Sequence, residues 1–269
     1  MSSSRRVPSS PQPRADRSRH KACARTSIAA ALLVVTGLLV STIGAGVATA
    51  SVVGDRALAG QINMHRSDLP VGANWTSSPS TPNPPGWVAT SRKVIACIQR
   101  AAGPALLVSP DPFGLGTAPN GDVTADVSSP TFAVKGPSQL PSASSEVVMT
   151  TSVVQATADL RAVDTSSALP CLKAAFQAIL TSEHVPAGTK LSVRPLPAPD
   201  IGPSRLRGGL RISVSGPSFG DLIEEAFFYT VGRAELALSF TALSKSFASG
   251  WALSISRKVV ARAETLLGS

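Results

Sequence analysis

The stretch "DLIEEAFFYTVGRAELALSFTAL", residues 221–243, decides the fold. Its two halves each alternate in the period-two pattern of a β-strand. One side of the first half carries Ile223, Phe227, Tyr229 and Val231, and one side of the second carries Leu236, Leu238, Phe240 and Ala242. Because only Val231-Gly232-Arg233 separates them, the sequence predicts a tight β-hairpin.

Further strand patterns precede this hairpin. Segments 190–196 ("KLSVRPL") and 205–216 ("RLRGGLRISVSG") both alternate, and the second places Leu206, Leu210, Ile212 and Val214 on one face. Segment 122–134 reads as a strand and a bend. Segment 144–154 ("SSEVVMTTSVV") reads as a strand with Val147, Met149, Thr151 and Val153 on one face. The strands therefore come in consecutive runs.

Helical spacing marks five other segments. The first three are 55–66 with Leu58, Ile62 and His65 inward, 90–104 with Val94, Ile95, Ile98 and Ala101, and 155–165 with Ala156, Leu160 and Val163. The fourth is 166–184, with Ser167 as N-cap and an apolar face of Leu172, Ala175, Phe176, Ile179 and Leu180. The fifth is 247–268, with Phe247, Trp251, Ile255, Val259, Ala263 and Leu266 on one side. In the last segment Arg257, Lys258, Arg262 and Glu264 are expected to face water. Segments 76–87 and 108–122 are rich in Pro, Ser and Gly and read as loops.

Helices that do not alternate with single strands favour an α+β fold. We expect an antiparallel β-sheet with α-helices packed on it, built as one sheet with one core. This domain spans residues 55–269.

The N-terminal part of the chain has a different composition. Residues 1–25 carry seven Lys/Arg and one Asp and form a disordered, cytoplasmic basic segment. Residues 26–54 are uncharged and read either as a cleaved signal peptide or as a transmembrane signal-anchor. Ala48-Thr49-Ala50 fits signal cleavage after Ala50, whereas the long uncharged run fits a retained anchor. Both interpretations place the following domain outside the cytoplasm, at the cell membrane or secreted.

The charge of the chain reflects this leader. The formal net charge is +9, of which residues 1–50 contribute +6, so the exported domain is only mildly basic. Aromatic residues make up 4% of the chain, too few for a base-stacking platform. We therefore expect no nucleic-acid partner. The expected partners are the membrane, through the N-terminal segment, and an unknown envelope ligand or protein.

Two cysteines, Cys97 and Cys171, lie in the exported part, each on a predicted helix. Outside the cytoplasm two cysteines usually pair, so we expect a disulfide. Two alternatives stay open, namely two unpaired buried thiols and a catalytic thiol activated by His184.

Other candidate sites are few. Gly216-Pro217-Ser218-Phe219-Gly220 matches the nucleophile-elbow pattern G-x-S-x-G, but a strand pattern follows it and no histidine lies after His184. Arg205, Arg207 and Arg211 share one face of a predicted strand and form a possible anion-binding face. No histidine, cysteine or carboxylate spacing fits a metal site, and we expect no cofactor.

The segments "INMHRSDLPVGANW", "VVMTTSVVQATADLRAV", "CLKAAFQAIL" and "VGRAELALSFTAL…WALSISRKVVARAE" give the chain a resemblance to actinobacterial exported proteins. These are the PknH-type extracellular sensor domains and the LpqN-type envelope proteins. The resemblance covers most of residues 60–267. It implies a PsbP-like sandwich and an extracytoplasmic binding or sensing module.

The function expected from the sequence is a non-enzymatic, sensor-like binding module of the cell envelope. A structural or assembly factor of the envelope is the first alternative. A serine hydrolase that uses Ser218 is the second.

Overall fold

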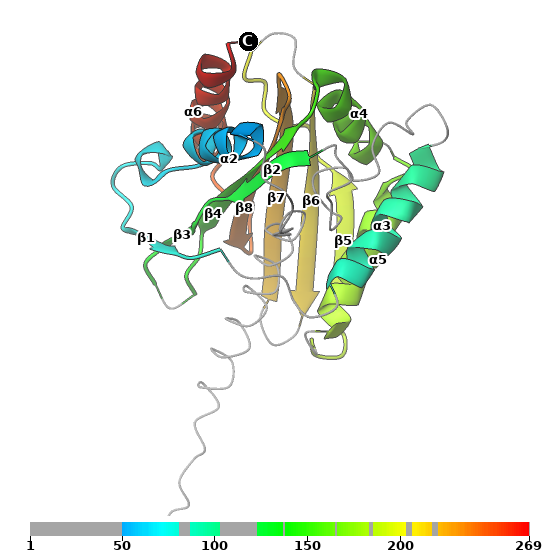
Figure 1. Ribbon diagram of the computed structural model, residues 1–269. Coiled ribbons are helices and arrows are strands. Elements are labelled where there is room, and N and C mark those ends of the chain that lie inside the picture. Colours follow the sequence, from blue (N-terminus) through cyan, green and yellow to red (C-terminus); the bar gives the residue numbers. More distant parts are fainter. Residues whose placement is uncertain are drawn as a thin grey trace, which may run out of the picture.

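The computed structural model describes residues 50–80, 87–102, 123–136, 138–164, 166–182, 185–202, 206–216 and 220–268. These residues form an α+β fold with five α-helices and an open, antiparallel sheet of eight strands (Figure 1). The predicted fold class is thereby confirmed at this level. The basic segment 1–25, nearly all of the leader 26–54 and the whole of the loop predicted at 108–122 lie outside the described residues.

The elements have the following bounds. The helices are α2 (Ala50–Ile62), α3 (Trp87–Ala102), α4 (Val153–Val163), α5 (Leu169–Ser182) and α6 (Ser249–Leu267), with a short 3₁₀ helix at Arg66–Asp68. The strands are β1 (Trp75–Ser78), β2 (Val123–Ser128), β3 (Thr131–Val134), β4 (Ser142–Thr150), β5 (Lys190–Pro195), β6 (Arg207–Gly216), β7 (Gly220–Val231) and β8 (Ala234–Leu243).

The strand order along the sheet is β1-β3-β4-β8-β7-β6-β5, and β2 pairs with β4 beside β3. The predicted hairpin is confirmed, because β7 pairs with β8 from Val231↔Ala234 outward to Leu222↔Leu243. Gly232 occupies the turn with a φ of 55°, in the left-handed region that glycine adopts without strain. The two long strands of residues 221–243 therefore lie at the centre of the sheet.

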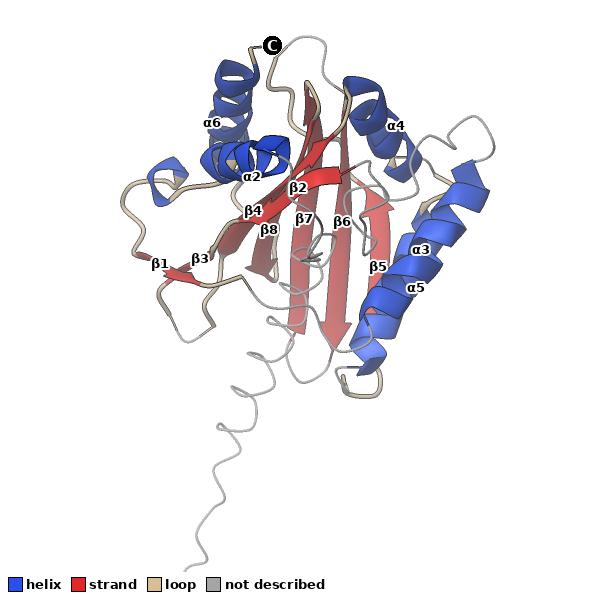
Figure 2. Ribbon diagram, in the orientation of Figure 1, coloured by secondary structure: helices blue, strands red, loops and turns tan. Residues whose placement is uncertain are grey.

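Helices cover both faces of this sheet, so the expectation of a single core is wrong. On one face, which we call the disulfide face, Leu210, Ile212, Val214, Leu222 and Phe228 pack with α3, α4 and α5. On the other, the terminal face, residues such as Phe227, Tyr229, Leu236, Leu238 and Phe240 pack with α2 and α6. Figure 2 shows the two sets of helices at opposite sides of the sheet. Strands β7 and β8 are long and buried on both sides, which divides the apolar residues into two clusters.

The terminal face joins the beginning of the described chain to its end. The carboxylate of Asp55 on α2 accepts a hydrogen bond of 2.8 Å from Arg233 Nη1 in the β7–β8 turn, and Arg233 Nη2 forms an ion pair with it. Arg262 on α6 pairs with Asp68 at 2.5 Å and donates to the Asn63 carbonyl at 2.6 Å. Arg262 thus binds the N-terminal segment, and the expectation that it only faces water is wrong.

Several predicted boundaries also need correction. Strand β4 ends at Thr150, because Ser152 accepts a hydrogen bond from the backbone N–H of Gln155 and caps α4. Val153 and Val154, expected to end the strand, are the exposed first residues of that helix. Strand β1 lies where a loop is predicted from residue 76, and it pairs with β3.

Single residues differ from the prediction as well. His65, Ala101 and Leu266 are exposed although the sequence pattern places them inward. His65 follows the end of α2 at Ile62, so the helical spacing no longer applies to it. The predicted N-cap Ser167 lies two residues before α5 begins.

Candidate functional site

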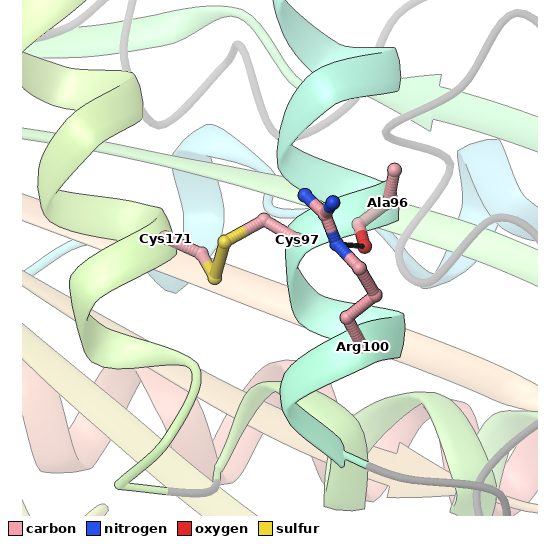
Figure 3. Close-up of a disulfide and its surroundings, with 4 residues drawn as sticks. All are labelled: Ala96, Cys97, Arg100 and Cys171. Carbon is pink, nitrogen blue, oxygen red and sulfur yellow. Dashed lines mark hydrogen bonds between the residues drawn. A yellow bond between two sulfur atoms is a disulfide. The ribbon is translucent and has the colours of Figure 1, made fainter.

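Cys97 and Cys171 form the predicted disulfide. Cys97 on α3 and Cys171 on α5 have Cα atoms 5.7 Å apart and are separated by 74 positions in the chain. Figure 3 shows both side chains directed toward each other between the two helices, while Arg100 donates to the Ala96 carbonyl at 3.1 Å. The bond fastens the two helices that cover the β5–β6 end of the disulfide face. Because both sulfurs are in the disulfide, Cys171 is no free thiol, and His184 lies outside the described residues.

Two of the predicted anion-binding arginines, Arg207 and Arg211, lie on β6, on the terminal face. Arg207 forms an ion pair with Asp200 at 2.7 Å, and Arg211 forms one with Glu225 at 3.3 Å. Arg205 lies outside the described residues. Arg194 on β5 is the register partner of Arg211 and is exposed, so this edge of the sheet has a cation that sequence reasoning missed. The anion-binding face stays a prediction.

The G-x-S-x-G segment connects two strands. Gly216 ends β6 and is the register partner of Gly220, which begins β7. A nucleophile elbow requires a helix after the serine, and here a strand follows. Ser218 itself lies outside the described residues.

A set of polar side chains that the sequence analysis did not single out lies on the disulfide face. Ser142 on β4, Thr241 on β8 and Glu224 on β7 are successive register partners and form a row across three neighbouring strands. Direct partners in antiparallel strands point to the same face, with Cβ atoms about 5 Å apart. Ser144 and Ser239 form the next row, two residues along the strands. We call these five residues the polar strip.

The polar strip is buried and poorly satisfied. Ser142, Thr241 and Glu224 each have an exposed fraction of 0%. The hydroxyls of Ser142 and Thr241 and both carboxyl oxygens of Glu224 have no hydrogen-bond partner among the described residues. A buried polar group without a partner costs about 1–3 kcal/mol, and a charged one costs more. This row therefore lowers the stability of the fold.

Burial controls the protonation of Glu224. It raises the pKa of the Glu224 carboxyl well above its usual range, and the nearby Ser239 hydroxyl opposes this by favouring the charged form. The Ser239 hydroxyl lowers the pKa of Glu224, but its geometry is not that of a hydrogen bond to either carboxyl oxygen. Burial therefore favours the neutral, protonated form of the Glu224 carboxyl.

A second buried acid, Glu146, lies on the same face but in another environment. Its register partner on β2 is Ser128, and its partner on β8 is Ala237. Burial raises the pKa of Glu146 well above its usual range, and the negative charge of Asp126 raises it further. Four residues on β8 separate the Glu146 row from the Glu224 row, which is about 13 Å along the strand. The two acids do not form one acid–base pair.

The polar strip reaches the surface at one point. Ser144 is half-exposed, whereas its register partner Ser239 is buried. Apolar residues adjoin the row, since Ile212 is the register partner of Glu224 on β6 and Ala226 is the next residue of β7 on this face. The three polar side chains of the row therefore lie next to buried apolar side chains on this face.

No protein-family model matches the chain, and neither curated proteins nor solved structures give a significant match to it. None of the helices in the described part of the chain has both the length and the apolar content that a membrane span needs. Among these residues, His, Cys, Asp and Glu side chains do not gather in groups of three or more that could hold a metal ion.

Proposed function

We propose that this chain is a non-enzymatic binding module of the cell envelope, exposed outside the cytoplasm and either anchored in the membrane or secreted. The polar strip carries the proposal. Its three central side chains are fully buried without partners, and a ligand is the simplest group that would satisfy them. The strip contains hydroxyls and an acid on rigid, neighbouring strands, a set suited to holding a ligand.

The location outside the cytoplasm has two supports. The leader has the charge asymmetry and the uncharged run of an export segment. The Cys97–Cys171 disulfide is a bond that persists in oxidising compartments. The resemblance to exported sensor domains agrees with both. Cell fractionation with N-terminal sequencing of the native protein would test this part, and a cytoplasmic protein that retains Met1 and two free thiols would contradict it.

The binding part is tested by thermal-shift screening of the purified protein against lipids, cell-wall fragments and envelope extract. We expect at least one fraction to raise the melting temperature. Thr241→Val keeps the shape of the side chain but removes the hydroxyl, so it should reduce that shift. Ser256→Ala is the matched control, because Ser256 is equally buried but lies on α6 at the terminal face. A shift that both variants preserve would place the binding site elsewhere.

A further inference from the structure

Strand β5 forms an open edge of the sheet. In the described part of the chain it pairs only with β6, and Figure 1 shows it at the outside of the strand array. All six of its residues are at least partly exposed. An edge strand presents backbone N–H and C=O groups without partners, so another extended chain can add to the sheet at this side.

The hydrogen-bond pattern shows which backbone groups point outward. The Leu196 N–H donates to the Gly209 carbonyl at 2.8 Å. Because mutually bonded pairs recur at every second residue of an antiparallel ladder, the even-numbered residues of β5 bond to β6. The N–H and C=O groups of Leu191 and Val193 therefore point away from the sheet. Pro195 occupies the next outward position, where its missing N–H costs no hydrogen bond to β6.

Two positive side chains flank these outward groups. Lys190 and Arg194 are exposed, and neither forms an ion pair or a side-chain hydrogen bond with the other described residues. Their side chains lie on the terminal face, where the register partner of Arg194 is Arg211. Arg211 is already paired with Glu225. The edge therefore carries two uncompensated positive charges, four positions apart.

We propose that β5 binds an acidic, extended segment of a partner protein, which adds to the sheet as an antiparallel strand. The bound segment has acidic side chains opposite Lys190 and Arg194, since opposite charges on neighbouring strands attract. Between them it has apolar side chains beside Leu191 and Val193, which adjoin the disulfide-face cluster. This surface lies outside the polar strip, so the inference goes beyond the proposed function and does not depend on it.

A second copy of the chain fits this edge less well. In an antiparallel pair of β5 strands, the register that pairs Leu191 with Val193 uses both residues of each copy. This register is centred on Ser192 and places Lys190 opposite Arg194 twice. Like charges directly opposite each other destabilise a strand pair. The edge therefore disfavours self-association and accepts a chain of opposite charge.

The probe is the peptide TEVTVET with blocked ends, titrated into the full-length, ¹⁵N-labelled protein and followed by NMR. When its valines lie opposite Leu191 and Val193, its two glutamates lie opposite the two cations. We expect a Kd of about 0.1–1 mM, typical of a weak contact, and a weaker affinity at high salt. Two control peptides should bind at least about tenfold more weakly: one with lysines for the glutamates, and one with N-methyl groups on both valines.

Amide hydrogen exchange tests strand addition directly. With saturating peptide, exchange at the outward N–H groups of Leu191 and Val193 should slow at least about fivefold, because each gains a hydrogen bond. Exchange at Ser192 should change by less than about twofold, because its N–H already bonds to β6. Electrostatic adsorption of the peptide without strand pairing would leave all three exchange rates unchanged.

Variants of the edge separate charge from backbone pairing. Val193→Pro removes one outward donor but no hydrogen bond to β6, and it should weaken binding about tenfold. The double charge reversal Lys190→Glu/Arg194→Glu should reject the acidic peptide and bind the lysine peptide instead. Lys245→Glu is the matched control, since Lys245 is exposed but follows β8, and its affinity should stay within about twofold of wild type. Backbone NMR spectra confirm that each variant is folded.

Several results would overturn the assignment. They are no binding of the acidic peptide, equal affinity for either control peptide, or unchanged exchange at Leu191 and Val193. Self-association of the chain that Val193→Pro abolishes would assign the edge to a second copy instead. None of these outcomes bears on the polar strip, whose test is the envelope screen with Thr241→Val.

Discussion

At the scale of single residues, Glu224 couples stability to pH. Its pKa in the unfolded chain is near 4.5, and burial raises the folded value well above this. Between these two values the folded protein keeps a proton that the unfolded chain releases, so folding becomes less favourable as pH rises. The loss of unfolding free energy reaches its full size once the pH has passed the pKa of Glu224 in the folded state. This loss is absent below the pKa of Glu224 in the unfolded chain.

Replacing Glu224 with Gln should therefore remove a pH-dependent penalty. Relative to Glu224→Gln, the wild-type protein should lose up to about 1.4 kcal/mol of unfolding free energy per pH unit as pH rises from 4.5 toward the folded pKa. Urea unfolding of both proteins at several pH values between 4.5 and 7.5 measures this difference. Parallel stability curves for the two proteins would show that Glu224 is not protonated in the fold.

A second residue pair, Asp55 and Arg233, stabilises α2. The Arg233 side chain bonds to both carboxyl oxygens of Asp55, and Thr124 donates to the same carboxylate at 2.5 Å. The Arg233 hydrogen bond lowers the pKa of Asp55 despite partial burial of this carboxyl. The carboxylate is therefore stabilising above the unfolded pKa of Asp55, and this contribution is lost as pH falls through the folded one.

Asp55→Asn should lower the unfolding free energy by about 1–3 kcal/mol at neutral pH, because it leaves the Arg233 charge poorly compensated. Asp200→Asn provides the comparison, since Asp200 also pairs with an arginine but its side chain is 71% exposed. We expect that exposed pair to contribute less than about 1 kcal/mol. Chemical unfolding at pH 7 measures both variants, and equal losses would contradict the role given to α2 docking.

At the scale of elements, Gly209 allows the backbone of β6 to approach the neighbouring backbone at Leu196 and Ala226 closely. A Cβ atom at this position would lie 2.5 Å from the Leu196 carbonyl oxygen and 3.1 Å from the Ala226 carbonyl oxygen. Both are backbone atoms, so neither can rotate away. At Gly208 the nearest atoms belong to the Asp164 side chain, which is easier to displace.

Gly209→Ala should consequently destabilise the protein by about 3 kcal/mol through overpacking in the sheet. Gly60→Ala is the opposite case: α2 is helical there and a Cβ would meet no atom within 4 Å. We expect that substitution to add about 0.5–1 kcal/mol, because alanine is the better helix former. Melting curves of the two variants should move in opposite directions.

Element types with a clear period were predictable from the sequence, and boundaries set by local hydrogen bonds were not. The β7–β8 hairpin, β6 and α6 followed from alternation or helical spacing of large apolar residues. Strand β1 was missed because it is four residues long and its pairing with β3 depends on a partner more than fifty residues away. The start of α4 was missed because the Ser152 cap overrides the β-propensity of Val153 and Val154.

At the scale of the whole molecule, the two-sided sheet and the polar strip were out of reach of sequence reasoning. In β8, Ser239 and Thr241 alternate with Leu238 and Phe240, which is the usual pattern of a strand with one wet face. Only the register of three strands shows that Ser142, Thr241 and Glu224 meet on a buried face. The disulfide partners, by contrast, were predictable because residues 51–269 contain only two cysteines.

The disulfide links two helices on one side of the whole molecule and closes a long loop. On the loop-entropy model a closure of this length stabilises by about 4 kcal/mol, so reduction should lower the melting temperature by roughly 10 °C. Thermal unfolding with and without dithiothreitol measures the effect. The Cys97→Ser/Cys171→Ser double variant should melt like the reduced protein and should not respond to the reductant.

The ion pair between Asp55 and Arg233 has a consequence for the timing of biosynthesis. The two residues are 178 positions apart, so at about 5–20 residues per second roughly 9–36 s pass between the synthesis of Asp55 and that of its partner. Arg262, the partner of Asp68, is made later still. Until then α2 can pack on β2 and β4 but lacks α6, the other element that it contacts. The native fold is completed only after α6 has been synthesised.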